Sequence, residues 1–244
     1  MKKLIYFTIG KNLLFVNLFK MCIETLNNTG YNGDILIITD CKDKIEKQIN
    51  FINDVYYLEL PKCDLLQSSA NKFKIYQFEK ISDYDKIIYC DADCLWIKNP
   101  DLLFELITEN KIYVANEKHL MIEKYYNCNF NEEETLRIQS QKIKGFSAGF
   151  FGFNRNCLET FKELDSITQQ KPEDAKWLEQ PIFVTNIFRK ELYSLDFNNF
   201  VSHIGRTVTQ NNQEFDGVVL HFGGDVGNYF EKYSFMFQFK LKRL

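Results

Sequence analysis

Two aspartates, Asp91 and Asp93, stand two residues apart directly after the apolar run Lys86–Cys90. Both cannot be buried without partners, because an unpaired charge inside a protein is very costly. Two close carboxylates also repel each other unless a cation lies between them. An Mg²⁺ or Mn²⁺ ion that also binds phosphate oxygens would remove both problems. The spacing therefore indicates a metal site. A solvated turn in which Asp93 caps the following segment is the alternative.

A histidine, His221, follows the short apolar run 218–220 and precedes Gly223 and Gly224. An imidazole added to two carboxylates would suit Mn²⁺ better than Mg²⁺ or Ca²⁺. The glycines would let the backbone approach a phosphate closely. The alternative is a structural histidine after a buried strand.

Two further groups of residues indicate a binding site more weakly. Ser147, Ala148 and Gly149 open an otherwise aromatic strand, which suggests that something packs against the backbone there. A tight bend or a helix contact would explain them equally well. Glu179 and Gln180 stand near the start of a predicted helix, where a carboxylate beside an amide can position a polyhydroxyl ligand. A solvated first turn is the alternative for this pair.

Strand and helix patterns alternate along the first half of the chain. Apolar, β-branched runs predict strands at residues 4–9, 34–39, 54–60, 86–90 and 111–115. Apolar residues at helical spacing predict helices at residues 11–28, 42–49 and 69–81. The alternation predicts an α/β fold with a mostly parallel, Rossmann-like sheet and helices on both faces. Ligands bind such sheets at the carboxyl ends of the strands, which is where Asp91 and Asp93 stand.

The second half of the chain is less regular. Residues 117–144 are polar and are expected to loop over one end of the sheet. Strands are predicted at 146–153 and 217–222, and helices at 156–168 and 177–189. The tail from Tyr229 to Leu244 mixes aromatic and basic residues, with Tyr229, Tyr233, Met236 and Phe237 on one helical face. We expect a helix that covers the core near the metal site, and a weak membrane-surface contact is the alternative.

Composition and charge limit the classes of protein that the chain can represent. Its 244 residues fit one domain, 1–244, with a nucleotide-binding half at 1–115 and a second half at 116–244. The net charge of −3 gives no electrostatic case for nucleic acid. The seven cysteines are odd in number and form no Cys-x-x-Cys pair, which favours reduced thiols in a cytoplasmic protein. No apolar run approaches the ~20 residues of a transmembrane helix.

Taken in order, these motifs resemble glycosyltransferase family 8, the glycogenin-like and bacterial lipopolysaccharide sugar transferases. Residues 81–93, Ile-Ser-Asp-Tyr-Asp-Lys-Ile-Ile-Tyr-Cys-Asp-Ala-Asp, look like the core signature of that family with its Asp-x-Asp metal motif. Residues 146–151, 179–180 and 221–224 are similar to its Asn-Ser-Gly strand, its Asp-Gln pair and its terminal His-Phe-x-Gly motif. The resemblance covers residues 3–232 and implies a GT-A fold.

The resemblance also implies a function and a site. A sugar would move from a UDP-sugar to an acceptor hydroxyl on a glycan or protein, with Mn²⁺, or alternatively Mg²⁺, and with retained anomeric configuration. The implied metal ligands are Asp91, Asp93 and His221, and Glu179 and Gln180 would act on the donor sugar. The implied nucleotide- and donor-binding residues are Phe7, Thr8, Ile9, Gly10, Lys72, Lys74, Asp91, Ala92, Ser147, Ala148, Gly149 and Gly224. A homodimer is compatible with this function.

Three positions depart from the pattern of the family. Ser147 replaces its asparagine, Glu179 replaces its aspartate, and Gly227 stands where it has a lysine that steadies the leaving diphosphate. We expect Lys232, in the first turn of the tail helix, to replace that lysine as a catalytic residue.

Two alternative functions remain. The three departures would suit a non-catalytic nucleotide-sugar-binding module that kept the fold. A haloacid-dehalogenase-like phosphatase also has Asp-x-Asp after an apolar strand, with the first aspartate as nucleophile. In that class Gly-Thr follows the second aspartate, whereas Cys94 and Leu95 follow here.

Overall fold

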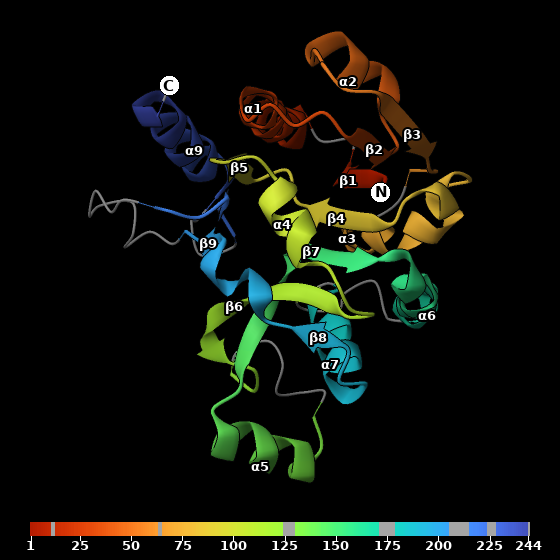
Figure 1. Ribbon diagram of the computed structural model, residues 1–244, viewed down its shortest axis with the longest axis vertical. Coiled ribbons are helices and arrows are strands. Elements are labelled where there is room, and N and C mark those ends of the chain that lie inside the picture. Colours follow the sequence, from red (N-terminus) through yellow and green to blue (C-terminus); the bar gives the residue numbers. More distant parts are fainter. Residues whose placement is uncertain are drawn as a thin grey trace.

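The computed structural model describes residues 1–10, 13–62, 65–123, 130–170, 179–204, 215–223 and 228–243. Seven strands form the main sheet in the order β3-β2-β1-β4-β7-β6-β8 (Figure 1). Their bounds are β1 Lys3–Ile9, β2 Asp34–Thr39, β3 Val55–Glu59, β4 Lys86–Cys90, β6 Ile112–Leu120, β7 Lys144–Asn154 and β8 Tyr193–Ser194. The strands β3, β2, β1 and β4 are parallel, and β7 runs antiparallel to β4 and to β6. The prediction of an α/β fold with a mostly parallel sheet is confirmed.

The strands are nearly continuous apolar runs because both faces of the sheet are covered. Along β1, Ile5 and Phe7 belong to one core cluster, whereas Leu4 and Tyr6 belong to the cluster on the opposite face. The first face is covered by α1 (Leu13–Asn28), α2 (Lys42–Gln48), α4 (Asp101–Leu106) and α9 (Tyr229–Arg243). The second face is covered by α3 (Leu65–Ala70), η1 (Asn71–Gln77), α6 (Leu158–Gln169) and α7 (Gln180–Arg189).

A second, three-stranded sheet has the order β5-β10-β9 and begins directly after Asp93. Its strands are β5 (Cys94–Trp96), β10 (Val219–His221) and β9 (Val201–His203). β10 runs antiparallel to β5 and parallel to β9. The register sets His221 opposite Cys94. Segments 128 residues apart in sequence thus bring the histidine beside the aspartate pair.

Two segments differ from the prediction. Residues 117–144 are not only loop, because β6 continues to Leu120 and α5 covers Glu132–Gln141. The side chain of Asn131 and that of Glu134 form a reciprocal capping box at the start of α5, a signal that was present in the sequence. The expected helix at 69–81 is instead α3 followed by the 3₁₀ helices η1 and η2 (Ile81–Asp83).

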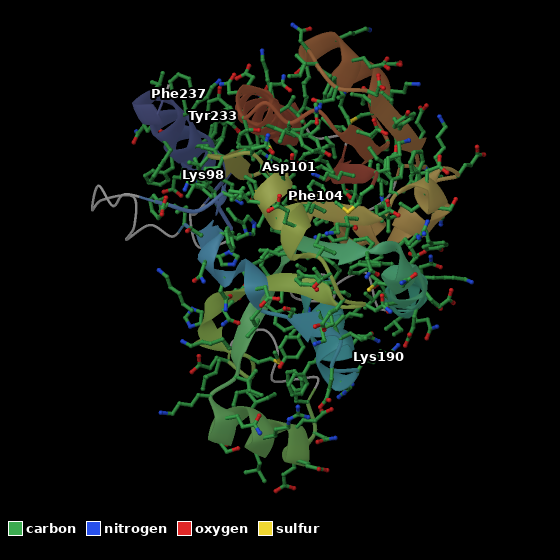
Figure 2. All side chains as sticks on the ribbon, viewed as in Figure 1. Lys98, Asp101, Phe104, Lys190, Tyr233 and Phe237 are labelled. Carbon is green, nitrogen blue, oxygen red and sulfur yellow. The ribbon has the colours of Figure 1, made fainter. Side chains whose placement is uncertain are left out.

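The C-terminal segment forms α9, which lies beside α1 (Figure 1). Met236 is fully buried in the core. The predicted apolar face is partly wrong, because Tyr233 and Phe237, labelled in Figure 2, are exposed. The face toward the protein carries Lys232 and Lys240 besides Met236, because both ammonium groups find carboxylate partners there. Among the described helices, none is both long and apolar enough to cross a membrane.

Candidate active site

Asp91 and Asp93 lie at the carboxyl end of β4, between the two sheets. The backbone N–H of Asp91 donates to the carbonyl of Gly149 over 2.8 Å, and the carbonyl of Asp93 accepts from the N–H of Phe222 over 2.9 Å. These bonds fasten the short turn to β7 on one side and to the end of β10 on the other. The structure therefore brings Asp91 and Asp93 beside Gly149 and the residues at the end of β10.

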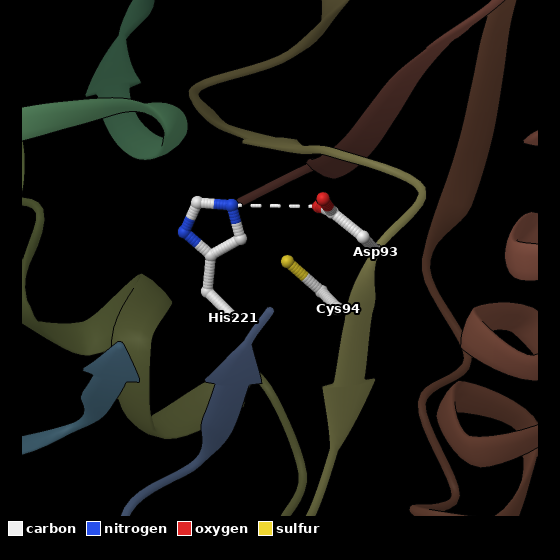
Figure 3. Close-up of side chains that lie close together, drawn as sticks. All are labelled: Asp93, Cys94 and His221. Atoms are coloured by element: carbon white, nitrogen blue, oxygen red, sulfur yellow. Dashed lines mark ion pairs between the residues drawn. The ribbon is translucent and has the colours of Figure 1, made fainter. Parts of the chain in front are cut away.

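Asp93 has two cationic or potentially cationic neighbours. Its Oδ2 lies 2.5 Å from Lys232 Nζ. Its Oδ1 lies 3.4 Å from His221 Nε2, the ion pair drawn in Figure 3. Burial alone would raise the pKa of Asp93, but the ammonium of Lys232 and the ring of His221 outweigh burial and lower it. Asp93 Oδ1 is nevertheless buried and accepts no hydrogen bond from any described residue.

Asp91 lies beside a buried tyrosine and a buried lysine. Tyr89 Oη donates a hydrogen bond to Asp91 Oδ1, and Lys72 Nζ lies 3.7 Å from the same oxygen. Burial raises the pKa of Asp91, the charge of Lys72 opposes that effect, and the carboxylate of Asp93 adds to it. The two aspartates therefore interact unfavourably in the absence of a cation between them.

Gly149 leaves room for the carboxylate of Asp91 and the imidazole of His221 to approach each other. A Cβ atom at this position would lie 2.6 Å from Asp91 Oδ2 and 2.7 Å from His221 Nε2. The carboxylate and the imidazole thus approach one point over the bare backbone of β7. The sequence predicted a close approach to this strand, and the structure shows which side chains make it.

Lys72 links the aspartate pair to Glu179. Lys72 Nζ lies 2.7 Å from Glu179 Oε1 and donates to the carbonyl of Ala148 over 3.0 Å. Burial disfavours the charge on Lys72, but Asp91 and Glu179 outweigh it and raise the pKa of the ammonium. Burial likewise opposes ionisation of Glu179, but Lys72, together with the hydroxyl of Ser69, lowers the pKa of that carboxyl. The result is a buried, ionised carboxylate held at a fixed place.

Three further predicted residues, Gln180, Ser147 and Lys74, differ in the contacts that they make. Gln180 Nε2 donates to Glu117 Oε1 over 2.9 Å, and Ser147 Oγ accepts from the N–H of Gly149 over 3.0 Å. Lys74 is on the same 3₁₀ helix as Lys72 but is half-buried and forms no ion pair with the described residues.

The predicted nucleotide-side residues at the end of β1 are mostly buried. Phe7 and Ile9 belong to the core, and Ala92 is buried beneath the metal motif. Thr8 Oγ1 is a buried hydroxyl that finds no hydrogen-bond partner among the described residues. Gly10 lies so close to Ser68 that a Cβ would be 2.8 Å from its hydroxyl oxygen. Gly224 and Gly227 lie outside the described residues.

Four side chains near the aspartates or their neighbours were not predicted to be functional from the sequence: Tyr89, Cys94, Glu117 and His203. His203 Nδ1 lies 3.1 Å from His221 Nδ1. Burial and the neighbouring His221 lower the pKa of His203 to about 3, whereas Asp93 outweighs burial and raises the pKa of His221. A pairing of β9 with β10 would have identified His203, but β9 has only three residues and was not predicted as a strand.

The donor set fits a divalent metal ion. Asp93, Cys94 and His221 each place one ligand atom within 4.8 Å of the others (Figure 3). Burial raises the pKa of the Cys94 thiol to about 12 in the absence of a metal, and soft sulfur ligands suit Mn²⁺ and Mg²⁺ less well than carboxylate oxygens do. The two aspartates and His221 offer hard oxygens and a borderline nitrogen, the ligands of Mn²⁺ and Mg²⁺. Asp93 Oδ1, which accepts no hydrogen bond from the described residues, and the bare backbone at Gly149 leave room for such an ion.

Comparisons with known proteins match the chain to glycosyltransferases. The model of glycosyl transferase family 8 matches residues 16–229. UDP-glucuronate:xylan alpha-glucuronosyltransferase 2 of Arabidopsis thaliana is 33% identical over 87 residues, which are 34% of this chain and 13% of the plant protein.

Two solved structures share the fold. A glycosyltransferase involved in the glycosylation of the major capsid of PBCV-1 has a TM-score of 0.58 and 13% identity, over 97% of this chain and 98% of that one. The apo-form glycosyltransferase GlyE of Streptococcus pneumoniae TIGR4 has a TM-score of 0.61 and 15% identity, over 99% of this chain and 64% of that one.

Proposed function

The chain belongs to glycosyl transferase family 8, and on this premise we propose that it moves a sugar from a UDP-sugar to an acceptor hydroxyl, with retention of configuration and with Mn²⁺ as the preferred metal. The observation that carries the proposal is the position of His221 at the carboxyl end of β4: its Nε2 lies 3.4 Å from Asp93 Oδ1, and it meets Asp91 Oδ2 over the bare backbone of Gly149. A cluster of two carboxylates and an imidazole is suited to a cation that bridges to a diphosphate.

The nucleotide would lie against the end of β1, where the hydroxyl of Thr8 has no hydrogen-bond partner among the described residues. Asp91, Asp93 and His221 would hold the metal, which supplies positive charge to the diphosphate when bound. Lys232 Nζ already lies beside Asp93, and we propose that it donates to the diphosphate as the bond to the sugar breaks. A preorganised donor of this kind stabilises the charge that develops on the leaving group.

The sugar would lie on the side of Glu179 and Gln180. The ionised carboxylate of Glu179 is 5% exposed, and its charge would stabilise positive charge on the anomeric carbon in the transition state. The bond from that carbon to the diphosphate oxygen breaks, the bond to the acceptor oxygen forms on the same face, and the acceptor proton passes to the departing phosphate. UDP is the second product.

Family membership favours this function over a phosphatase, and residues 1–244 are proposed to act as one catalytic domain. The donor sugar is a matter for experiment, because the chain spans 13% of the plant glucuronosyltransferase. The test is a panel of UDP-sugars, UDP-glucuronate included, in which UDP release is measured with Mn²⁺ present. At least one donor should release UDP with the native chain and not with Asp93→Asn. Binding of a UDP-sugar without any release would instead indicate a non-catalytic module.

A further inference from the structure

His203 is a half-buried neighbour of His221 that none of the sequence motifs includes. β9 pairs with β10 in parallel, and the register sets His203 beside His221. Residues paired in this way project from the same face of a sheet. The N–H of Ile204 also donates to the carbonyl of His221 over 2.8 Å. The backbone thus holds the two imidazoles next to each other.

The contact between the rings constrains where their protons lie. The two Nδ1 atoms are 3.1 Å apart, and the ring centroids are 5.2 Å apart. A neutral imidazole has one N–H donor and one acceptor nitrogen, so one of the two Nδ1 atoms must carry the hydrogen that joins them. The other nitrogen of His221, Nε2, faces Asp93 Oδ1 at 3.4 Å. The choice of tautomer therefore decides whether Nε2 has a free lone pair.

We propose that His203 is a positioning residue of the metal site, whose Nδ1 accepts a hydrogen bond from Nδ1–H of His221 and so directs the Nε2 lone pair toward the aspartates. This inference rests on the proposed function, because it assigns His221 as a metal ligand. Without the acceptor, Asp93 would draw the imidazole proton to Nε2, where it would block the metal. Histidines that bind metals usually donate their second N–H to such a partner, and loss of the partner typically weakens metal binding 10–100-fold.

The test compares His203→Phe with His203→Asn, because phenylalanine fills the space without an acceptor and asparagine supplies one at the place of Nδ1. Binding of Mn²⁺ alone is measured by electron paramagnetic resonance of the free ion, without nucleotide or activity. We expect about 10–100-fold weaker binding for His203→Phe and near-native binding for His203→Asn. His119→Asn, a partly exposed position on β6, is the matched control and should bind as the native chain does.

Each outcome decides a different point. No Mn²⁺ binding by the native chain would contradict the proposed function itself. Native binding with unchanged affinity in His203→Phe, or equal losses in both variants, would overturn the role of His203 and leave the proposed function intact. Nitrogen NMR of the Mg²⁺-loaded native chain gives an answer even if His203→Phe does not fold. The proton of His221 should be on Nδ1, and a proton on Nε2 would overturn the inference.

Discussion

Lys232 Nζ lies 2.5 Å from Asp93 Oδ2, so α9 places an ammonium group beside a carboxylate that we propose as a metal ligand. The lysine side chain is 15% exposed, and the two residues are 139 apart in sequence. The charge of Asp93 outweighs the effect of burial and raises the pKa of Lys232, so the ammonium is retained. In the absence of a metal the Lys232 ammonium pairs with Asp93. On the proposed function it would be well placed to contact the diphosphate once the metal binds.

The first prediction concerns the role of Lys232 in turnover. Lys232→Ala should lower kcat about 10²–10³-fold, because one preorganised donor to a developing negative charge contributes that much. Steady-state kinetics with the donor found in the panel measure this. The control is Lys240→Ala on the same helix, whose ammonium pairs with Glu24 rather than with the site. Equal, small effects of both substitutions would leave the leaving-group cation unassigned.

A second prediction concerns metal binding in the absence of nucleotide. Lys232→Met should bind Mn²⁺ about tenfold more tightly than the native chain, because a competing cation beside Asp93 is removed. Titration calorimetry with Mn²⁺ alone checks this. Weaker binding by Lys232→Met would show that the lysine supports the site rather than competes with the ion. The opposite signs expected for turnover and metal affinity separate this role from general damage to the fold.

The sequence predicted the main sheet well because its strands are long apolar runs. β2 and β4 have the bounds expected from the pattern alone. The short strands β5 and β9 have only three residues each, too few for a periodicity to be recognised. These two segments are strands because each pairs with β10, and such pairing between distant segments is not visible in the local sequence pattern. Because β9 was not predicted, His203, which is its last residue, was not predicted to lie at the site.

The candidate site was predictable where its residues stand in motifs. His221 and Lys232 both contact Asp93 in the structure, and Asp91 and His221 approach each other over Gly149. The choice between Lys72 and Lys74 was not predictable, because a 3₁₀ helix has three residues per turn and directs side chains differently from the expected α-helix.

The third prediction uses the space at Gly149. Gly149→Ala should weaken Mn²⁺ binding and turnover severely, because the new Cβ would lie 2.6–2.7 Å from Asp91 Oδ2 and His221 Nε2. Metal titration and kinetics report the effect. Gly30→Ala is the comparison, because Gly30 has a φ of 75° and nothing within 4 Å of an added Cβ. It should lower the free energy of unfolding by about 1 kcal/mol without a change in metal affinity.

The fourth prediction concerns the sugar side of the site. Glu179→Gln should lower kcat about 10²–10³-fold while it leaves the affinity for UDP near native, because the lost charge acts on the sugar rather than on the nucleotide. Kinetics and UDP titration together separate the two effects. Glu163→Gln is the control, since that carboxylate pairs with Lys190 on the surface. A large loss of UDP affinity with unchanged kcat would move Glu179 to the nucleotide side.

The central claim is that a divalent metal on Asp91, Asp93 and His221 joins the diphosphate to this fold. Calorimetric titration of UDP into the native chain, once with Mn²⁺ and once with EDTA, tests it most directly. We predict clear binding with Mn²⁺, at least about tenfold weaker binding in EDTA, and the same weak binding for Asp93→Asn in either solution. Equal UDP affinity of the native chain with Mn²⁺ and with EDTA would contradict the metal bridge.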